Sequence, residues 1–198
     1  MSAESVPQPW RPFLRELDEA MTASVDLHCL GGFVISARYG LLRPTGDLDV
    51  CEIVPSTSAN VLLQLGGRNS QLHKKHGVYL QMVKVARLPE NYGDRLQRMF
   101  PDAFRHLRLF ALDPYDLALS KLERNLDVDV EDVKHLARTM PLNLEKLRQR
   151  YREELRPLPG RPEREDLTLD LWVEAIEEER AARPPTSPPS VRSQQREE

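Results

Sequence analysis

Two aspartates, Asp47 and Asp49, are separated by one residue at the start of an apolar run. If this run forms a strand, alternate side chains point to the same face, so the two carboxylates project together about 7 Å apart along the strand. Two carboxylates on one face are suitable ligands for Mg²⁺, which also binds the phosphate oxygens of a substrate. The pair therefore predicts metal-assisted chemistry on a substrate that contains phosphate.

Two adjacent glycines, Gly31 and Gly32, lie between an expected strand over residues 25–30 and an expected short helix over residues 33–39. Glycines at this place let a phosphate approach the backbone N–H groups at the start of a helix. The alternative interpretation is a tight turn without a ligand, which is the more common use of an isolated Gly-Gly pair. The nearby Asp-x-Asp pair favours the phosphate site.

A third carboxylate on a neighbouring strand commonly completes such a site. The strand expected over residues 78–85 instead carries Gln81, which can contact a metal but adds no charge. Glu52 is close in sequence, yet strict alternation along the strand places it on the opposite face from Asp49. The missing carboxylate leaves two alternatives, an active enzyme and a catalytically degenerate binding module.

A second group of charged residues follows some seventy residues later: Lys121, Arg124, Asp127, Asp129 and Asp132. Lys121 and Arg124 are one turn apart on an expected helix and share a face. Two cations together there could bind a triphosphate. The alternative is a solvated face of internal ion pairs, which the spacing alone favours.

The order of expected elements is helix, strand, helix, strand, helices, strand, strand and then helices only. This order predicts an α/β or α+β core with a small mixed sheet over residues 1–112, followed by a helical C-terminal region over residues 113–180. Asp113 and Pro114 are typical of a helix start, and this helix is expected to reach Asn125. The proline-rich residues 181–198 are expected to be a disordered tail.

The chain has 198 residues and a net charge of −3, so no overall basic field indicates a nucleic-acid partner. An arginine-rich segment over residues 143–164 could touch RNA, or its charges could pair internally. Cys29 and Cys51 lie in apolar runs and indicate buried thiols in a reducing compartment. Because no run approaches the ~20 apolar residues of a membrane span and no signal peptide is recognised, we expect a cytoplasmic protein without a membrane partner.

The motifs resemble those of known nucleotidyltransferases. Gly31-Gly32 followed by Arg43-x-Thr45-x-Asp47-Leu48-Asp49-Val50 resembles the signature of the minimal nucleotidyltransferase superfamily. The later segment with Pro114-Tyr115-Asp116-Leu117, Lys121, Arg124, Asp129 and Asp132 resembles the AbiEii-like toxin nucleotidyltransferases and a related uncharacterised bacterial family. The resemblance covers roughly residues 25–140. It departs at Val128, where the motif usually has arginine, and at Gln81.

The resemblance implies a polymerase-β-like nucleotidyltransferase fold with an NTP as substrate and Mg²⁺ as cofactor. It also implies a bacterial toxin–antitoxin setting, in which NMP is transferred to an RNA (tRNA) or protein acceptor. By motif, the residues with implied roles are Asp47 and Asp49 as catalytic metal ligands, Asp129 as a further catalytic carboxylate, and Gly31, Gly32, Lys121 and Arg124 as nucleotide-binding residues.

Three other interpretations stay open from the sequence. The chain could be a degenerate nucleotidyltransferase fold that acts as a binding or regulatory module, as Gln81 suggests. It could be an antitoxin-type transferase that modifies a partner toxin with the same catalytic residues. Finally, the motifs could be coincidental in a generic α/β domain, which would place Asp47 and Asp49 on different faces or far from Gly31.

Overall fold

The computed structural model describes residues 5–83 and 87–182. Its centre is a five-stranded mixed sheet with the strand order β3-β2-β1-β5-β4. The strands are β1 (Val25–Leu30), β2 (Asp47–Val54), β3 (Tyr79–Met82), β4 (Gln97–Met99) and β5 (Leu107–Ala111). β1 is antiparallel to β2 and parallel to β5, whereas β3 is parallel to β2 and β4 is antiparallel to β5.

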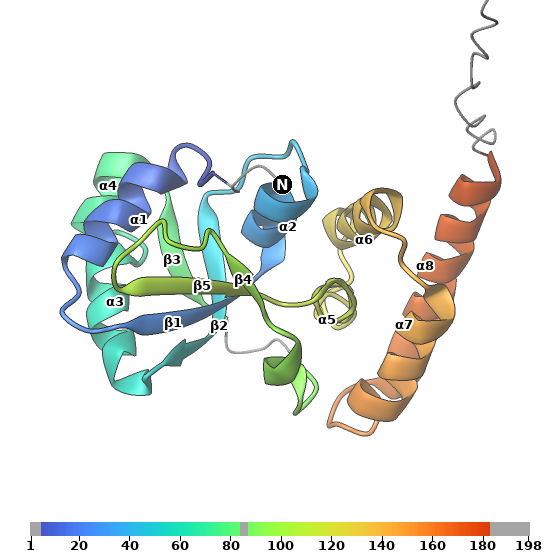
Figure 1. Cartoon of the computed structure of the whole chain (residues 1–198). Helices are drawn as coiled ribbons and strands as arrows, with labels where there is room; N and C mark the ends of the chain where they lie inside the picture. The colour runs from blue at the N-terminus through green and yellow to red at the C-terminus, as the bar shows by residue number, and fades with distance from the viewer. Residues whose placement is uncertain (1–4, 84–86, 183–198) are drawn as a thin grey trace, which may run out of the picture.

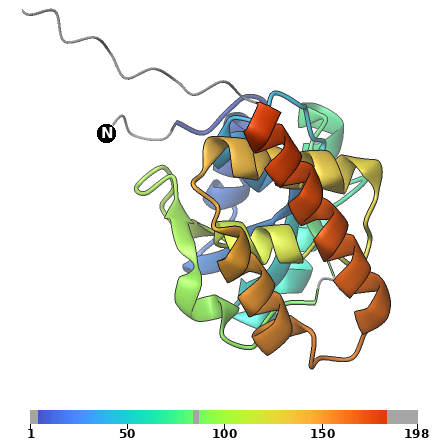
Figure 2. The ribbon, with the colours of Figure 1, turned by 90° about the vertical axis from the view of Figure 1, so that its right-hand side faces the viewer.

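Helices surround the sheet and then form a separate layer beside it (Figure 1). The helices are α1 (Trp10–Glu19), α2 (Gly31–Tyr39), α3 (Ala59–Gly66), α4 (Gln71–His76), α5 (Pro114–Leu119), α6 (Asp127–Thr139), α7 (Leu144–Arg150) and α8 (Pro162–Ala182). α1 to α4 pack around the sheet, while α6 contacts both α2 and α8. Figure 2 shows α8 running across the outside of this helical layer. No helix within the described residues is long and apolar enough to cross a membrane.

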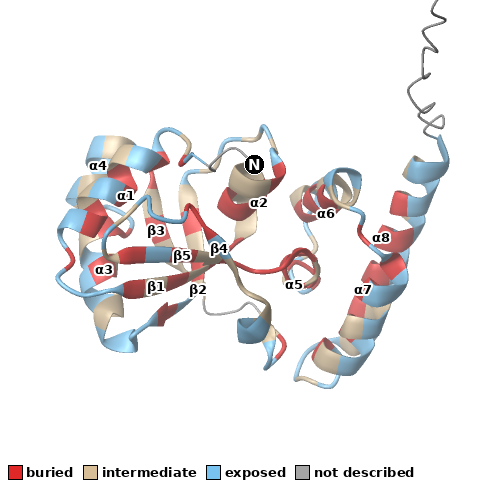
Figure 3. Ribbon diagram, viewed as in Figure 1, coloured by how far each residue is buried: buried red, intermediate tan, exposed pale blue. Residues whose placement is uncertain are grey.

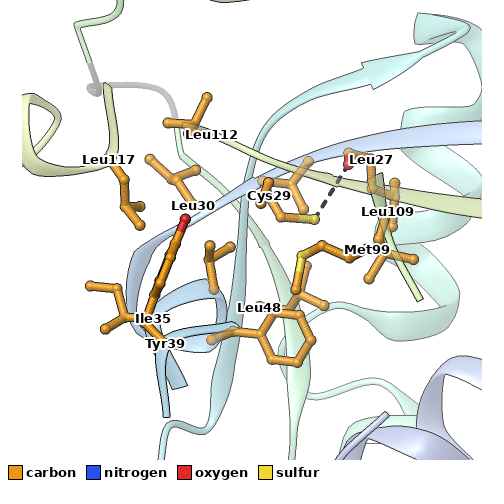
Figure 4. Packing of buried hydrophobic residues seen from close by; sticks show 14 of the residues in the cluster. Leu27, Cys29, Leu30, Ile35, Tyr39, Leu48, Met99, Leu109, Leu112 and Leu117 are labelled. Carbon is orange, nitrogen blue, oxygen red and sulfur yellow. Dashed lines mark hydrogen bonds between the residues drawn. The ribbon is translucent and has the colours of Figure 1, made fainter. Parts of the chain in front are cut away.

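Buried and less buried residues alternate along the strands of the sheet (Figure 3), so the sheet has one apolar face and one more polar face. Along β1, Leu27 and Cys29 are fully buried, whereas Asp26 and His28 are only partly covered. The apolar face forms the core with α2, and Figure 4 shows Leu27, Cys29, Leu48, Met99 and Leu109 packed together there. We call the other face, which carries Asp26, His28, Asp47, Asp49 and Gln81, the open face.

A β-bulge in β2 changes which residues lie on the open face. His28 pairs with Glu52, but the next residue, Cys29, pairs with Val50, so Cys51 is an extra residue in β2. Such a bulge interrupts the alternation of side chains and can redirect one of them. The prediction that Glu52 faces away from the Asp49 side is therefore wrong, because Glu52 contacts His28 on the open face.

The predicted α/β class with a mixed sheet and a helical C-terminal part is confirmed. Two local predictions are wrong. The short strand β4 lies within residues 89–100, where the sequence predicts only an irregular or helical connection, and α5 ends at Leu119 instead of Asn125. α8 begins at Pro162 and continues to Ala182, so residues 181 and 182 are helical, and the remainder of the expected tail lies outside the described residues.

A buried carboxylate, Asp18 at the end of α1, fixes the start of β5. Its two oxygens accept the backbone N–H groups of Arg105, His106 and Leu107 at 2.7–2.9 Å. Burial alone raises the pKa of Asp18, but these hydrogen bonds outweigh it and lower the pKa below the usual 3.8. Asp18 therefore stabilises the fold in its ionised form.

Replacing Asp18 with asparagine is expected to lower the free energy of unfolding by about 1–3 kcal/mol. The substitution removes the charged group that accepts hydrogen bonds from three backbone N–H groups. The folded-state pKa lies below the unfolded value, so the contribution is present above pH 3.8 and is lost as the pH falls through the folded-state pKa. Urea denaturation at pH 7 and at pH 3 measures this. The difference in the free energy of unfolding between wild type and Asp18→Asn should be smaller at pH 3 than at pH 7. An equal difference at both pH values contradicts the account.

Candidate nucleotide and metal site

Asp47 and Asp49 project together from β2, as their spacing predicts. Both are half-buried and alternate with the fully buried Leu48 and Val50. Thr45 Oγ1 donates a hydrogen bond to Asp47 Oδ1 at 2.6 Å and so fixes the first carboxylate. Burial, and then the charge of Asp47, raises the pKa of Asp49 to about 6. The two carboxylates therefore repel each other in a partly dry environment.

Gly31 and Gly32 are the first two residues of α2, directly beside these carboxylates. Gly31 has φ +74°, and a Cβ at this position would come closer than 3.0 Å to Asp49 Oδ2. A Cβ on Gly32 would lie 3.4 Å from Thr45 Oγ1. Both glycines thus let the start of the helix approach the carboxylates, and they leave its backbone N–H groups uncovered by side chains.

Gln81 on β3 is the register partner of Asp49, at the place where a third carboxylate would complete the site. Its Nε2 donates to Asp49 Oδ1 at 3.2 Å, while Tyr79 OH donates to its Oε1 at 3.4 Å. The amide oxygen is turned toward Tyr79 and the amide NH₂ group toward the carboxylate. Gln81 is therefore oriented as a hydrogen-bond donor to Asp49, which is not the orientation of a metal ligand.

Lys121 and Arg124 lie across from the carboxylates, but they do not share a helix face. α5 ends at Leu119, and the chain continues in turns through Arg124. The N–H of Lys121 bonds to Ala118 O at 3.1 Å, an i to i−3 bond that tightens the backbone. The two cations reach the site from these turns, and their charges lower the pKa of Asp49, against the larger effects of burial and Asp47.

Two fully buried aspartates on α6 hold these cations in place. Asp129 accepts from Lys121 Nζ at 3.3 Å, from Arg124 Nε at 2.9 Å and from the N–H of Leu126 at 3.0 Å. Asp132 accepts from Lys121 Nζ at 2.7 Å. With its acceptor positions occupied, Asp129 is placed to position Lys121 and Arg124, and it shares no hydrogen bond with Asp47 or Asp49.

Arg43 extends this network to the loop that precedes β2. Its Nη2 lies 2.7 and 3.0 Å from the two oxygens of Asp132. Arg43, Asp132, Lys121, Asp129 and Arg124 thus form one chain of alternating charges that joins the sheet to the helical part. The sequence showed Arg43 as part of the motif, but its partner is 89 residues away, so no local pattern identifies the pair.

One cavity of about 390 Å³ brings the two groups together. It is lined from the sheet by Leu30, Gly31, Asp49, Gln81 and Val83, and from the turns after α5 by Ser120, Lys121, Glu123 and Arg124. This volume lies in the range of small-molecule sites. The Asp49 carboxylate on one wall and the cations Lys121 and Arg124 on the other suit a polyphosphate that carries a metal ion.

The donor set of the site fits Mg²⁺. A divalent cation would relieve the repulsion that raises the pKa of Asp49, and substrate phosphates would supply the remaining ligands. Within residues 5–83 and 87–182, no group of three or more His, Cys, Asp or Glu side chains is placed to hold a metal. The residues that could hold such an ion are Asp47 and Asp49, and a bound nucleotide would have to supply the remaining ligands.

The arginine-rich segment mostly pairs internally. Arg148 contacts Asp170, Arg150 contacts Asp113, and Arg156 contacts Asp166. A larger hollow of about 720 Å³ lies between α7 and α8 over some of these pairs. Two of the arginines that line this hollow, Arg148 and Arg156, are paired with acidic residues, and the hollow contains none of the motif residues, so we place the candidate site at the carboxylate cavity.

Comparison with known proteins relates the chain to nucleotidyltransferases. A family model described as "Nucleotidyltransferase of unknown function (DUF6036)" matches residues 13–179, which include every residue that lines the cavity. No curated protein and no solved structure matches the chain. The match confirms the resemblance to the nucleotidyltransferase superfamily and excludes coincidental motifs. Because it covers most of the sequence, the chain belongs to the nucleotidyltransferase family of unknown function DUF6036.

Proposed function

We propose that the protein transfers NMP from an NTP to a hydroxyl group of an RNA, such as a tRNA, or of a protein. The observation that carries this proposal is the single cavity that Asp49, Gly31, Lys121 and Arg124 share. Their chemistry matches the three needs of nucleotidyl transfer: metal ligands, a phosphate cradle at a helix start and cations for the leaving pyrophosphate.

In this arrangement the backbone N–H groups at Gly31 and Gly32 bind the β- and γ-phosphates, together with Lys121 and Arg124. Mg²⁺ held by Asp47 and Asp49 would supply positive charge beside the α-phosphoryl group. The acceptor oxygen attacks the α-phosphorus in line, and pyrophosphate leaves toward the cations. Asp129 positions Lys121 and Arg124 and does not touch the reacting atoms.

We propose a bacterial toxin–antitoxin setting from the motif resemblance to AbiEii-like toxin nucleotidyltransferases. The protein then acts either as the toxin or as an antitoxin-type transferase that modifies a partner toxin. Growth arrest on expression in bacteria, absent with Asp49→Asn, supports the toxin role. Rescue of a toxic neighbouring gene product supports the antitoxin role, and the absence of both effects contradicts the setting.

A degenerate binding module is the second candidate, because Gln81 is turned toward Asp49 as a donor and supplies no third charge. The test is incubation of total RNA and total protein with [α-³²P]NTPs, using wild type and Asp47→Asn. We expect label in one acceptor fraction for wild type and a decrease of at least 100-fold for the variant, since such electrostatic groups contribute about 10²–10³ in rate. NTP binding without labelled acceptor favours the binding module.

A further inference from the structure

Three side chains meet on the open face beside the candidate site, and the mechanism above does not use them. The bulge at Cys51 turns Glu52 toward His28, and Tyr92 from the single turn η2 (Tyr92–Arg95) lies against both. Tyr92 OH donates a short hydrogen bond to Glu52 Oε2. His28 Nδ1 lies 3.0 Å from Tyr92 OH and 3.4 Å from Glu52 Oε2.

These contacts fix the tautomer of His28. Because the Tyr92 proton points to Glu52, the Tyr92 oxygen can only accept from His28. Nδ1 therefore faces two acceptors and carries the hydrogen, which leaves the lone pair of the neutral imidazole on Nε2. Nε2 has no hydrogen-bond partner among the described residues, and the side chain keeps 13% of its surface exposed.

The position of His28 along β1 suits the attacking side of the reaction. Leu30 is the register partner of Asp49, Gly31 follows it directly, and His28 precedes it by two residues on the same face. The phosphate cradle and His28 therefore lie on opposite sides of Asp49 along the strand, with His28 about 7 Å from Leu30. In-line displacement needs the leaving group and the attacking oxygen on opposite sides of the phosphorus.

We propose that His28 is the general base that activates the acceptor hydroxyl, with Tyr92 and Glu52 as positioning residues. The inference rests on the proposed nucleotidyl transfer. His28 Nε2 takes the hydroxyl proton as the acceptor oxygen bonds to the α-phosphorus. The bond from the α-phosphorus to the bridging oxygen breaks, and pyrophosphate leaves with the electron pair. The imidazolium, stabilised beside Glu52, then returns its proton to solvent.

The surroundings of His28 agree with this role. Burial lowers its pKa below the usual 6.5, against the opposing effect of the Glu52 and Asp26 carboxylates, so the ring is neutral at pH 7. The other groups facing it are the Cys51 thiol, which donates to His28 O, the Phe110 ring, and Arg108, which pairs with Asp26. Gln81 cannot serve instead, because an amide does not take up a proton at neutral pH.

The test measures formation of labelled NMP from [α-³²P]NTPs with water as acceptor, and binding of NTP analogues whose α,β-bridging oxygen is a CH₂ group. For His28→Gln we expect kcat to fall about 100-fold, the usual size of general base catalysis. Analogue affinity should stay within twofold, and added imidazole should restore part of the rate to His28→Ala. The kcat of Tyr92→Phe should fall about tenfold. His106→Gln, a histidine remote from the cavity at the start of β5, is the matched control.

Each outcome decides the proposal. In wild type the acidic limb of the pH–kcat profile should contain a group that titrates below pH 6.5, and His28→Gln should remove this group and leave only the titration of Asp49 near its pKa of about 6. An unchanged kcat for His28→Gln overturns the base role and leaves nucleotidyl transfer standing. If His28→Gln loses kcat and analogue affinity equally, His28 has a merely structural role, and the proposed base role is overturned as well. ¹⁵N NMR of the imidazole should show the Nδ1–H tautomer, and an Nε2–H tautomer contradicts the proposal without any activity assay. A wild type that neither binds nor reacts overturns the proposed function and, with it, this inference.

Discussion

Replacing Gly31 with alanine is expected to lower the rate of nucleotidyl transfer about 100-fold or more, because displacing reacting groups by 1 Å can cost that much. The new Cβ would come closer than 3.0 Å to Asp49 Oδ2, so the carboxylate or the start of α2 must move. The left-handed φ of +74° adds a strain of about 1–2 kcal/mol for an L side chain.

A matched control separates the strain from the displacement. Gly40 at the other end of α2 has φ +69°, but a Cβ there meets nothing within 4 Å. Gly40→Ala should lose similar thermal stability and keep its activity, as measured by denaturation and by pyrophosphate release. Equal activity of both variants would show that the close approach of Gly31 to Asp49 has no part in the reaction.

Replacing Asp129 with asparagine is expected to lower the free energy of unfolding by about 3–5 kcal/mol, as found when one partner of a buried ion pair is removed. The hydrogen bonds of Arg124 and the backbone N–H of Leu126, together with the charge of Lys121, lower the pKa of Asp129, although burial opposes them. An anion held so firmly is a poor proton acceptor. Because Asp129 holds Lys121 and Arg124 in place, Asp129→Asn should bind NTP analogues at least tenfold more weakly.

The pattern of losses distinguishes a positioning role from a catalytic one. If Asp129 were instead a catalytic carboxylate, as the resemblance implies, that acted as general base, Asp129→Asn would lose kcat and keep its analogue affinity. Asp127→Asn is the control, because Asp127 is exposed in the first turn of the same helix and should change both quantities little. Calorimetric titration with the CH₂-bridged analogues measures the affinity.

The parts of the site that the sequence predicted are those set by local rules. Asp47 and Asp49 share a face because side chains alternate along a regular strand, and Gly31 lies next to them because a strand and a helix meet there. The distance from Gly31 to Asp49 Oδ2 was not predictable, since it depends on how β1 and β2 pair.

The parts that the sequence missed depend on contacts between distant segments. The bulge that turns Glu52 toward His28 follows from the register of two strands, and alternation within β2 gives no sign of it. α5 ends early where Lys121 turns to reach Asp129 and Asp132, so ion pairing overrides the helix signal. The role of Arg43 follows from a contact with Asp132 on α6, far away in the chain.

The most direct test of the nucleotidyl-transfer site compares two labels in the same NTP. With [α-³²P]NTP and Mg²⁺, the account predicts that label appears in the acceptor, or in NMP when water is the acceptor. With [γ-³²P]NTP it predicts that all released label is pyrophosphate, and that Asp49→Asn abolishes both signals. Transfer of γ-label to an acceptor, release of orthophosphate, or equal signals from wild type and Asp49→Asn would contradict the assignment of this cavity.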